Sequence, residues 1–112
     1  MLGTLKTRLS TLESALSVRQ QISFAVAALC LGFVLVAPHT NYPAHAHPAL
    51  ELYHVISGRA RWTAGGTVED RRPGDFILHP SGIRHAMSTS EEPLLTIYTW
   101  TGDVASPSRF LP

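Results

Sequence analysis

The stretch from residue 45 to residue 53 places two imidazoles, a carboxylate and a phenol at a spacing that suits one face of a β-strand. Side chains two residues apart in a strand point to the same side, so the odd-numbered positions share a face if the strand is regular: His45, His47, Glu51 and Tyr53. Pro48 can bend the chain here without separating the imidazoles from the carboxylate. Imidazole and carboxylate are ligands of divalent first-row metals. The spacing therefore predicts a metal site.

A fourth ligand is available in the segment "PGDFILHPSGIRH", residues 73–85. His85 follows the turn at Pro80 and Gly82, where a strand can carry it back over the first one. His79 ends the preceding strand beside that turn, and we place it at the periphery of the site. We therefore predict His85 as the fourth ligand.

Two kinds of element are expected around these residues. Residues 4–20 place leucines at helical spacing, which predicts an amphipathic helix inside an N-terminal segment of residues 1–28; these leucines are Leu5, Leu9, Leu12 and Leu16. From about residue 29, short apolar or alternating runs are separated by turn residues, with no helical pattern between them. This texture predicts an antiparallel β-sandwich or barrel over residues 29–112.

One apolar run admits a second interpretation. Residues 22–37 carry no charge over 16 residues, whereas a membrane span needs about 20 apolar residues, with about 17 as the lower limit. A secretory signal would end in a small-residue cleavage site, which does not follow clearly here. We interpret the run as the end of a helix followed by a fully buried strand, with a membrane or signal segment as the alternative.

The composition is that of a compact globular domain, with 112 residues, 45% hydrophobic and 15% charged. The net charge is +1 and the basic residues are scattered, so we expect no nucleic-acid partner. Cys30 is the single cysteine, which excludes an intrachain disulfide and favours a cytoplasmic location. Edge strands of the expected sheets allow a homodimer.

Two motifs follow one another in the order and separation typical of cupins. The matching positions are His45, His47, Glu51 and Gly58 in "HAHPALELYHVISG", and Gly74, Pro80, Gly82 and His85 in "GDFILHPSGIRH". Two turn positions depart from the pattern, because His39 stands where glycine is expected and Thr89 where asparagine often closes the second motif. Histidine tolerates positive φ, so the resemblance still implies an all-β, single-domain cupin, a small antiparallel β-barrel or jelly roll.

Among cupins, the chain resembles the cupin-type dimethylsulfoniopropionate lyases from about residue 31 to residue 103. The more specific matches are "YPAHAHPALELY" and the late "WTGD". The resemblance implies β-elimination of a small-molecule substrate, dimethylsulfoniopropionate, to dimethyl sulfide and acrylate. It implies one divalent transition metal, which could be Fe, Mn, Zn, Ni or Co, on His45, His47, Glu51 and His85. It also implies a tyrosine base at Tyr53 and substrate-side aromatics at Tyr42 and Trp100.

The residue types agree with that chemistry. A phenol with a pKa near 10 is a weak base, but a nearby cation lowers its pKa. The sulfonium end of the substrate is a cation without a hydrogen-bond donor, and aromatic faces bind such a group with about 0.5–2 kcal/mol per contact. The candidates are Tyr42, Tyr98 and Trp100, with Trp62 as a weaker one. Tyr53 has a structural alternative, as a core tyrosine with a satisfied hydroxyl.

Two other functions fit the same four ligands. One is another small cupin metalloenzyme, such as a dioxygenase or an isomerase, and the other is a non-catalytic ligand-binding cupin. A dioxygenase would need iron and O2 and has no evident use for Tyr53. The lyase needs Tyr53 and is indifferent to O2, so the two enzymes differ in both requirements.

Overall fold

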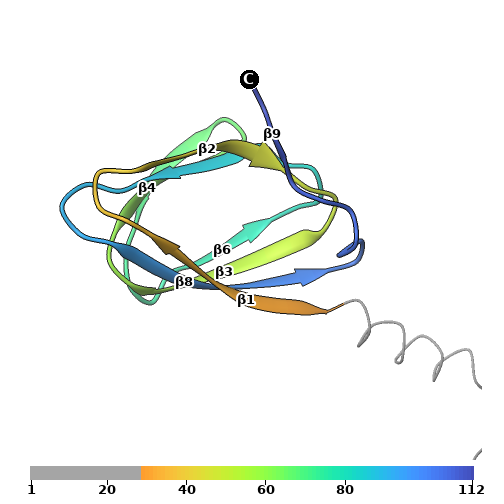
Figure 1. The fold of residues 1–112 in the computed structure, drawn as a ribbon, viewed down its shortest axis with the longest axis horizontal. Coiled ribbons are helices and arrows are strands. Elements are labelled where there is room, and N and C mark those ends of the chain that lie inside the picture. The colour runs from red at the N-terminus through yellow and green to blue at the C-terminus, as the bar shows by residue number, and fades with distance from the viewer. Residues whose placement is uncertain (1–28) are drawn as a thin grey trace, which may run out of the picture.

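The computed structural model describes residues 29–112, and within that part the chain forms nine strands in two antiparallel sheets (Figure 1). The strands are β1 (Cys30–Val36), β2 (Asn41–Ala46), β3 (Leu50–Ser57), β4 (Ala60–Ala64), β5 (Thr67–Arg71), β6 (Phe76–His79), β7 (His85–Ser88), β8 (Leu94–Thr101) and β9 (Arg109–Phe110). The predicted all-β cupin architecture is confirmed. The helix predicted over residues 4–20 lies outside the described residues.

The chain crosses repeatedly between the two sheets. The four-stranded sheet has the order β1-β8-β3-β6, and the five-stranded sheet has the order β5-β4-β7-β2-β9. Figure 1 shows the two sheets facing each other across the interior. Strands β2 and β7 pair in one sheet, with His45 opposite His85, while β3 belongs to the other. The predicted ligands are therefore held from both walls of the barrel.

The core lies between the sheets and follows the alternation of the strands. On β3, Glu51, Tyr53 and Val55 are buried, while Leu52 and Ile56 point outward and stay exposed. This confirms the predicted odd-numbered face for Glu51, Tyr53 and Val55. His45 lies on β2 in the other sheet and His47 in the connection, so the two histidines do not share one regular strand with Glu51. The largest fully buried side chain is Trp62 on β4, and it belongs to the same apolar cluster as Tyr53. A ligand face and a hydrophobic core therefore share one interior.

The prediction of a fully buried strand within residues 22–37 is wrong for β1. This strand is an edge of the four-stranded sheet, and it alternates between inward and outward side chains. Leu31, Phe33 and Leu35 are 68%, 71% and 72% exposed, whereas Val36 is 4% exposed. An unbroken apolar run is typical of a strand covered on both faces, and among the described residues only one face of β1 is covered.

The two departures from the cupin motifs are accommodated at turns. His39 has φ of 52°, and it is the one non-glycine residue with positive φ among residues 29–112. Thr89 donates its hydroxyl to the carbonyl of Ala37 at 2.5 Å and accepts the N–H of Thr40 at 3.0 Å. Both residues therefore close the connection between β1 and β2, as expected from their types. In the part of the chain from residue 29 onward, no helix has the length and apolar character to cross a membrane.

Candidate metal centre

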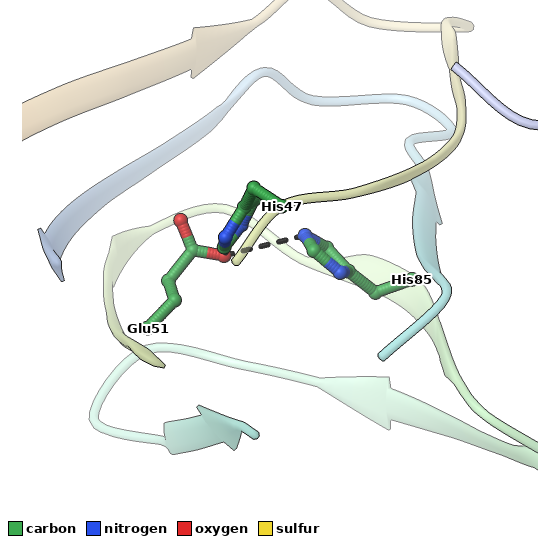
Figure 2. A group of neighbouring side chains, drawn as sticks. All are labelled: His47, Glu51 and His85. Atoms are coloured by element: carbon green, nitrogen blue, oxygen red, sulfur yellow. Dashed lines mark hydrogen bonds and ion pairs between the residues drawn. The ribbon is translucent and has the colours of Figure 1, made fainter. Parts of the chain in front are cut away.

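Three of the four predicted ligands meet at one buried point. His47 follows β2, Glu51 lies on β3, and His85 begins β7. Their ligand atoms all lie within 4.8 Å of one another, and the three side chains are at most 4% exposed. Figure 2 shows the two imidazoles and the carboxylate pointing toward a common centre from separate parts of the chain. The arrangement could hold a metal ion.

The backbone determines which imidazole nitrogen faces the centre. The Nδ1 atoms of His45, His47 and His85 lie 2.7, 3.0 and 3.0 Å from the carbonyl oxygens of Pro43, Ala49 and Ile83. A carbonyl can only accept, so each Nδ1 must carry the hydrogen and donate it. In the neutral imidazole the other nitrogen, Nε2, then carries a lone pair. Nε2 is therefore the atom left free to bind a metal.

With both imidazoles neutral and Nδ1 carrying the hydrogen, no hydrogen lies between the carboxylate oxygen and the two Nε2 atoms at the centre. Oε1 of Glu51 lies 3.2 Å from Nε2 of His47 and 3.3 Å from Nε2 of His85. Among the described residues, Nε2 of His85 is one of two buried side-chain polar atoms without a hydrogen-bond partner. Facing lone pairs repel one another, and a buried polar atom without a partner is costly. A divalent cation would accept all three lone pairs, so the donor set fits a metal.

His45 stands beside this group rather than inside it. Its ring centroid is 4.1 Å from that of His85 and 6.4 Å from that of His47. Burial lowers the pKa of His45, which favours the neutral imidazole that a metal needs. His45 is not part of the group whose ligand atoms meet at the centre, and its role as a ligand stays a prediction.

His79 is closer to the centre than its sequence position suggests. Its side chain is fully buried, its Nδ1 lies 3.1 Å from Oε1 of Glu51, and its Nε2 accepts the indole N–H of Trp62 at 3.0 Å. An indole N–H can only donate, so Nε2 is an acceptor and Nδ1 must donate to the carboxylate. His79 therefore holds Glu51 and is not a free ligand. The inward position of Ile77, two residues earlier on β6, is the alternation that indicates an inward His79.

The carboxylate of Glu51 is held on both oxygens. His79 donates to Oε1, and the indole N–H of Trp100 donates to Oε2. Burial alone would raise the pKa of Glu51, but the contacts with His79, His85 and Trp100, together with the nearby His47, outweigh burial and hold the pKa well below its ordinary value. Glu51 is therefore an ionised, oriented carboxylate, as a metal ligand must be.

Tyr53 lies in the same interior as the candidate ligands, two residues after Glu51 on β3. It is 3% exposed, and its ring lies 4.9 Å from Trp62 and 5.5 Å from His79, measured between ring centroids. Burial raises the pKa of Tyr53 above its ordinary value, and the charge of Glu51 acts in the same direction. A base at this position needs a cation nearby to reverse that shift. The structure accommodates both predicted roles, the base and the packed core tyrosine.

The other predicted aromatics lie in the same interior as the ligand residues. The ring of Trp100 lies 4.3 Å from that of His47, and the ring of Tyr42 lies 4.6 Å from that of His45. Tyr98 is half-buried, with its ring 5.9 Å from Trp100 and 6.2 Å from Tyr53. Trp100 and Tyr42 are therefore next to candidate metal ligands, and Tyr98 is next to Trp100 and Tyr53.

A groove of about 430 Å³ lies beside His47. It is lined by Ala46, His47, Pro48, Ser81, Gly82, Pro107 and Arg109. Its size is within the usual range of small-molecule sites, about 300–1,000 Å³. His47 is the residue common to the groove and to the group of ligands, so the groove lies next to the centre.

The two facing antiparallel sheets and the two sequence motifs that they bring together define the chain as a cupin. Solved cupins share this fold at low sequence identity. The chain is similar to an RmlC-like cupin from Shewanella frigidimarina with a TM-score of 0.64 and 17% identity, covering 70% of this chain and 69% of that one.

Closer similarity identifies the family. The family model described as dimethylsulfoniopropionate lyase matches residues 23–96. The dimethylsulfoniopropionate lyase DddQ of Ruegeria pomeroyi is 37% identical over 82 residues, which cover 72% of this chain and 41% of that protein. Its crystal structure superposes with a TM-score of 0.72 and 32% identity, covering 74% of this chain and 43% of that chain. The chain belongs to the dimethylsulfoniopropionate lyase family, and it matches less than half the length of this relative.

Proposed function

We propose that this chain is a metal-dependent lyase that cleaves dimethylsulfoniopropionate to dimethyl sulfide and acrylate. One observation carries the proposal: the ligand atoms of His47, Glu51 and His85 meet at a buried point within 4.8 Å of one another, in the same interior as the phenol of Tyr53. Membership of the lyase family supports the same substrate. We propose His45 as a fourth ligand beside His47, Glu51 and His85.

The reaction needs help at two charged ends of the substrate. A bound divalent metal supplies a Lewis acid that offsets the negative charge developing beside the substrate carboxylate. The aromatic faces of Tyr42, Tyr98 and Trp100 can bind the sulfonium group, which offers no hydrogen bond. These three residues therefore orient the substrate with its carboxylate toward the ligands.

Tyr53 is the proposed base. Its phenolate removes the proton from the carbon next to the carboxylate, and the electron pair of that C–H bond forms the new C=C bond. The C–S bond breaks, its electron pair leaves with sulfur as neutral dimethyl sulfide, and acrylate remains. The neutral phenol then returns its proton to water, so charge and atoms balance.

The test measures dimethyl sulfide in the headspace above metal-loaded protein and dimethylsulfoniopropionate, without O2. Release from the wild type and a loss of about 100-fold or more in kcat for Tyr53→Phe are expected, because a general base contributes about 10²–10⁴-fold. The metal content of the variant should equal that of the wild type, since the phenyl ring keeps its packing against Trp62.

Two results would contradict parts of the proposal. No release by the wild type with any of Fe, Mn, Co, Ni and Zn excludes the lyase. Equal kcat for the wild type and Tyr53→Phe excludes the tyrosine base and leaves the metal centre standing. Conducting the assay without O2 separates the lyase from a dioxygenase, which would be inactive under those conditions.

A further inference from the structure

The side of the four-stranded sheet that faces away from the core is apolar from edge to edge, and we refer to it as the outer apolar face. Its exposed members come from β1, β3 and β6: Leu31, Phe33, Leu35, Leu52, Ile56, Phe76 and Leu78. The register aligns one row across all four strands, with Phe33 opposite Ile97, Ile97 opposite His54, and His54 opposite Phe76. The imidazole of His54 stacks on Phe76 with ring centroids 4.2 Å apart.

This face is unusual for a sheet in contact with water. An antiparallel sheet with one solvated side normally carries polar residues on that side. The strand positions of the outer apolar face hold no Asp, Glu, Lys or Arg among the described residues. Four strands about 4.8 Å apart and about seven residues long present roughly 400 Å² in projection. A patch of that size on a monomer commonly marks an interaction site.

Residues 4–20 have the chemistry to cover it. Their sequence predicts an amphipathic helix with a stripe of leucines, and their charged residues mostly lie elsewhere on the helix. A helix of 17 residues is about 25 Å long, close to the length of a strand of seven or eight residues, at about 23–26 Å. The leucine stripe makes apolar contacts and needs no charged partner. This suits the outer apolar face, whose strand positions carry no charged residue among the described residues.

The position of this segment in the chain also favours it. It is followed by residues 21–28 and then by β1, which is an edge strand of the outer apolar face. Eight residues span at most about 26–29 Å, enough to turn back over the sheet. A tethered partner acts at an effective concentration in the millimolar range, so it outcompetes a second copy of the chain at micromolar concentration.

We propose that residues 4–20 dock on the outer apolar face, with the leucine stripe against β1, β8 and β3. The proposal does not depend on catalysis or on the metal. Its prediction is specific for one side of the segment: Leu12, in the stripe, lies near Leu52 at the centre of the face, and Ser14, on the opposite side of the predicted helix, does not.

Crosslinking of the full-length chain tests this. Cys30 is the only native cysteine, so Cys30→Ser provides a background for the pair Leu12→Cys and Leu52→Cys and for the control pair Ser14→Cys and Leu52→Cys. With a short bismaleimide, the Leu12 pair should give an internally linked monomer at least about five times more efficiently than the control. A thermal melt verifies that each variant is folded, and the pair Leu16→Cys and Phe33→Cys, with Phe33 on β1, replaces any variant that is not.

Other results overturn the proposal. Equal linking of the leucine and serine pairs means that the segment has no preferred side, and absence of linking means that it is elsewhere. Linked dimers in place of linked monomers mean that a second copy covers the face. Sedimentation gives an independent measurement: Leu12→Glu should cause self-association that Ser14→Glu does not cause, whereas a wild-type dimer dissociated by Leu52→Glu would assign the face to a second copy.

Discussion

Replacing Trp62 by Phe should weaken metal binding although Trp62 is not a ligand. The indole N–H donates to Nε2 of His79, and His79 donates from Nδ1 to Oε1 of Glu51. Phenylalanine keeps an aromatic ring in the core and removes only the donor and part of the ring. Nε2 of His79 then has no donor, and this nitrogen is fully buried.

The expected loss of metal affinity follows from the two positions that the hydrogen of His79 can take in Trp62→Phe. Keeping its hydrogen on Nδ1 leaves Nε2 unsatisfied, at a cost of about 1–3 kcal/mol. Moving the hydrogen to Nε2 removes the donor from Glu51 and turns a lone pair toward the carboxylate. Loss of a partner that orients a metal ligand typically costs about 10–100-fold in affinity. We therefore expect the Kd for the bound metal to rise by at least about tenfold.

The assay is titration of the metal-free protein with Zn2+, Co2+ or Mn2+ by calorimetry. His79→Leu, which removes the donor itself, should weaken binding at least as much as Trp62→Phe. His79→Gln should recover part of the loss, because its amide can donate to the carboxylate. Met87→Ala is the control for a damaged core, since Met87 belongs to the same apolar cluster as Trp62. It should lower Tm and leave the Kd unchanged.

A Kd within twofold of the wild type in folded Trp62→Phe and His79→Leu would refute the reasoning. A loss of equal size in Met87→Ala would refute it as well, because the effect would then come from core packing in general. Activity is not needed for either outcome, so the test of the hydrogen-bond chain is independent of the proposed reaction.

Three further predictions concern stability. Because the pKa of Glu51 is held below its ordinary value, its charge stabilises the fold above about pH 4.3, and this contribution is lost as the pH falls further. The midpoints of urea unfolding at pH 7 and pH 3.5 should therefore differ less in Glu51→Gln than in the wild type. In Gly32→Ala the new Cβ would lie 2.6–2.7 Å from ring atoms of Tyr98, so the free energy of unfolding should fall by about 1–3 kcal/mol. The fall should be much smaller in a Tyr98→Leu background, and additive losses of the two variants would contradict this contact. Metal at about 100 times its Kd should stabilise the wild type by about 2.7 kcal/mol, which a thermal melt measures as a rise in Tm. The variant His85→Gln should lose this rise in Tm. The control His54→Gln, on the outer side of the sheet, should keep it.

The ligands could be predicted from the sequence because period-two alternation and two short motifs locate them. The odd-numbered face of β3 follows from spacing alone, and His85 follows from its place after a turn. The orientation of each imidazole could not be predicted in this way, since it depends on carbonyl groups of Pro43, Ala49 and Ile83 whose direction exists only in the folded chain.

His79 and β1 could not be assigned from the sequence for two different reasons. The role of His79 depends on Trp62, which is 17 positions away in sequence and lies on a strand of the other sheet. The apolar run that contains β1 does not alternate between apolar and polar residues, so the sequence does not indicate which face of β1 is buried. Only the pairing of β1 with β8 in the folded chain defines the exposed face. Both features are consequences of strand order, which local patterns do not encode.

The base and the metal are linked through one electrostatic condition. Tyr53 is packed as a core residue, and both its burial and the charge of Glu51 raise its pKa. Only a positive charge nearby can reverse that direction, and Glu51 also provides the carboxylate that would hold such a charge. The more firmly His79 and Trp100 orient Glu51 toward a metal, the less of its negative charge is left to oppose a phenolate at Tyr53. A packed tyrosine and a catalytic tyrosine are therefore compatible at this position, provided that the carboxylate beside it is neutralised by a cation.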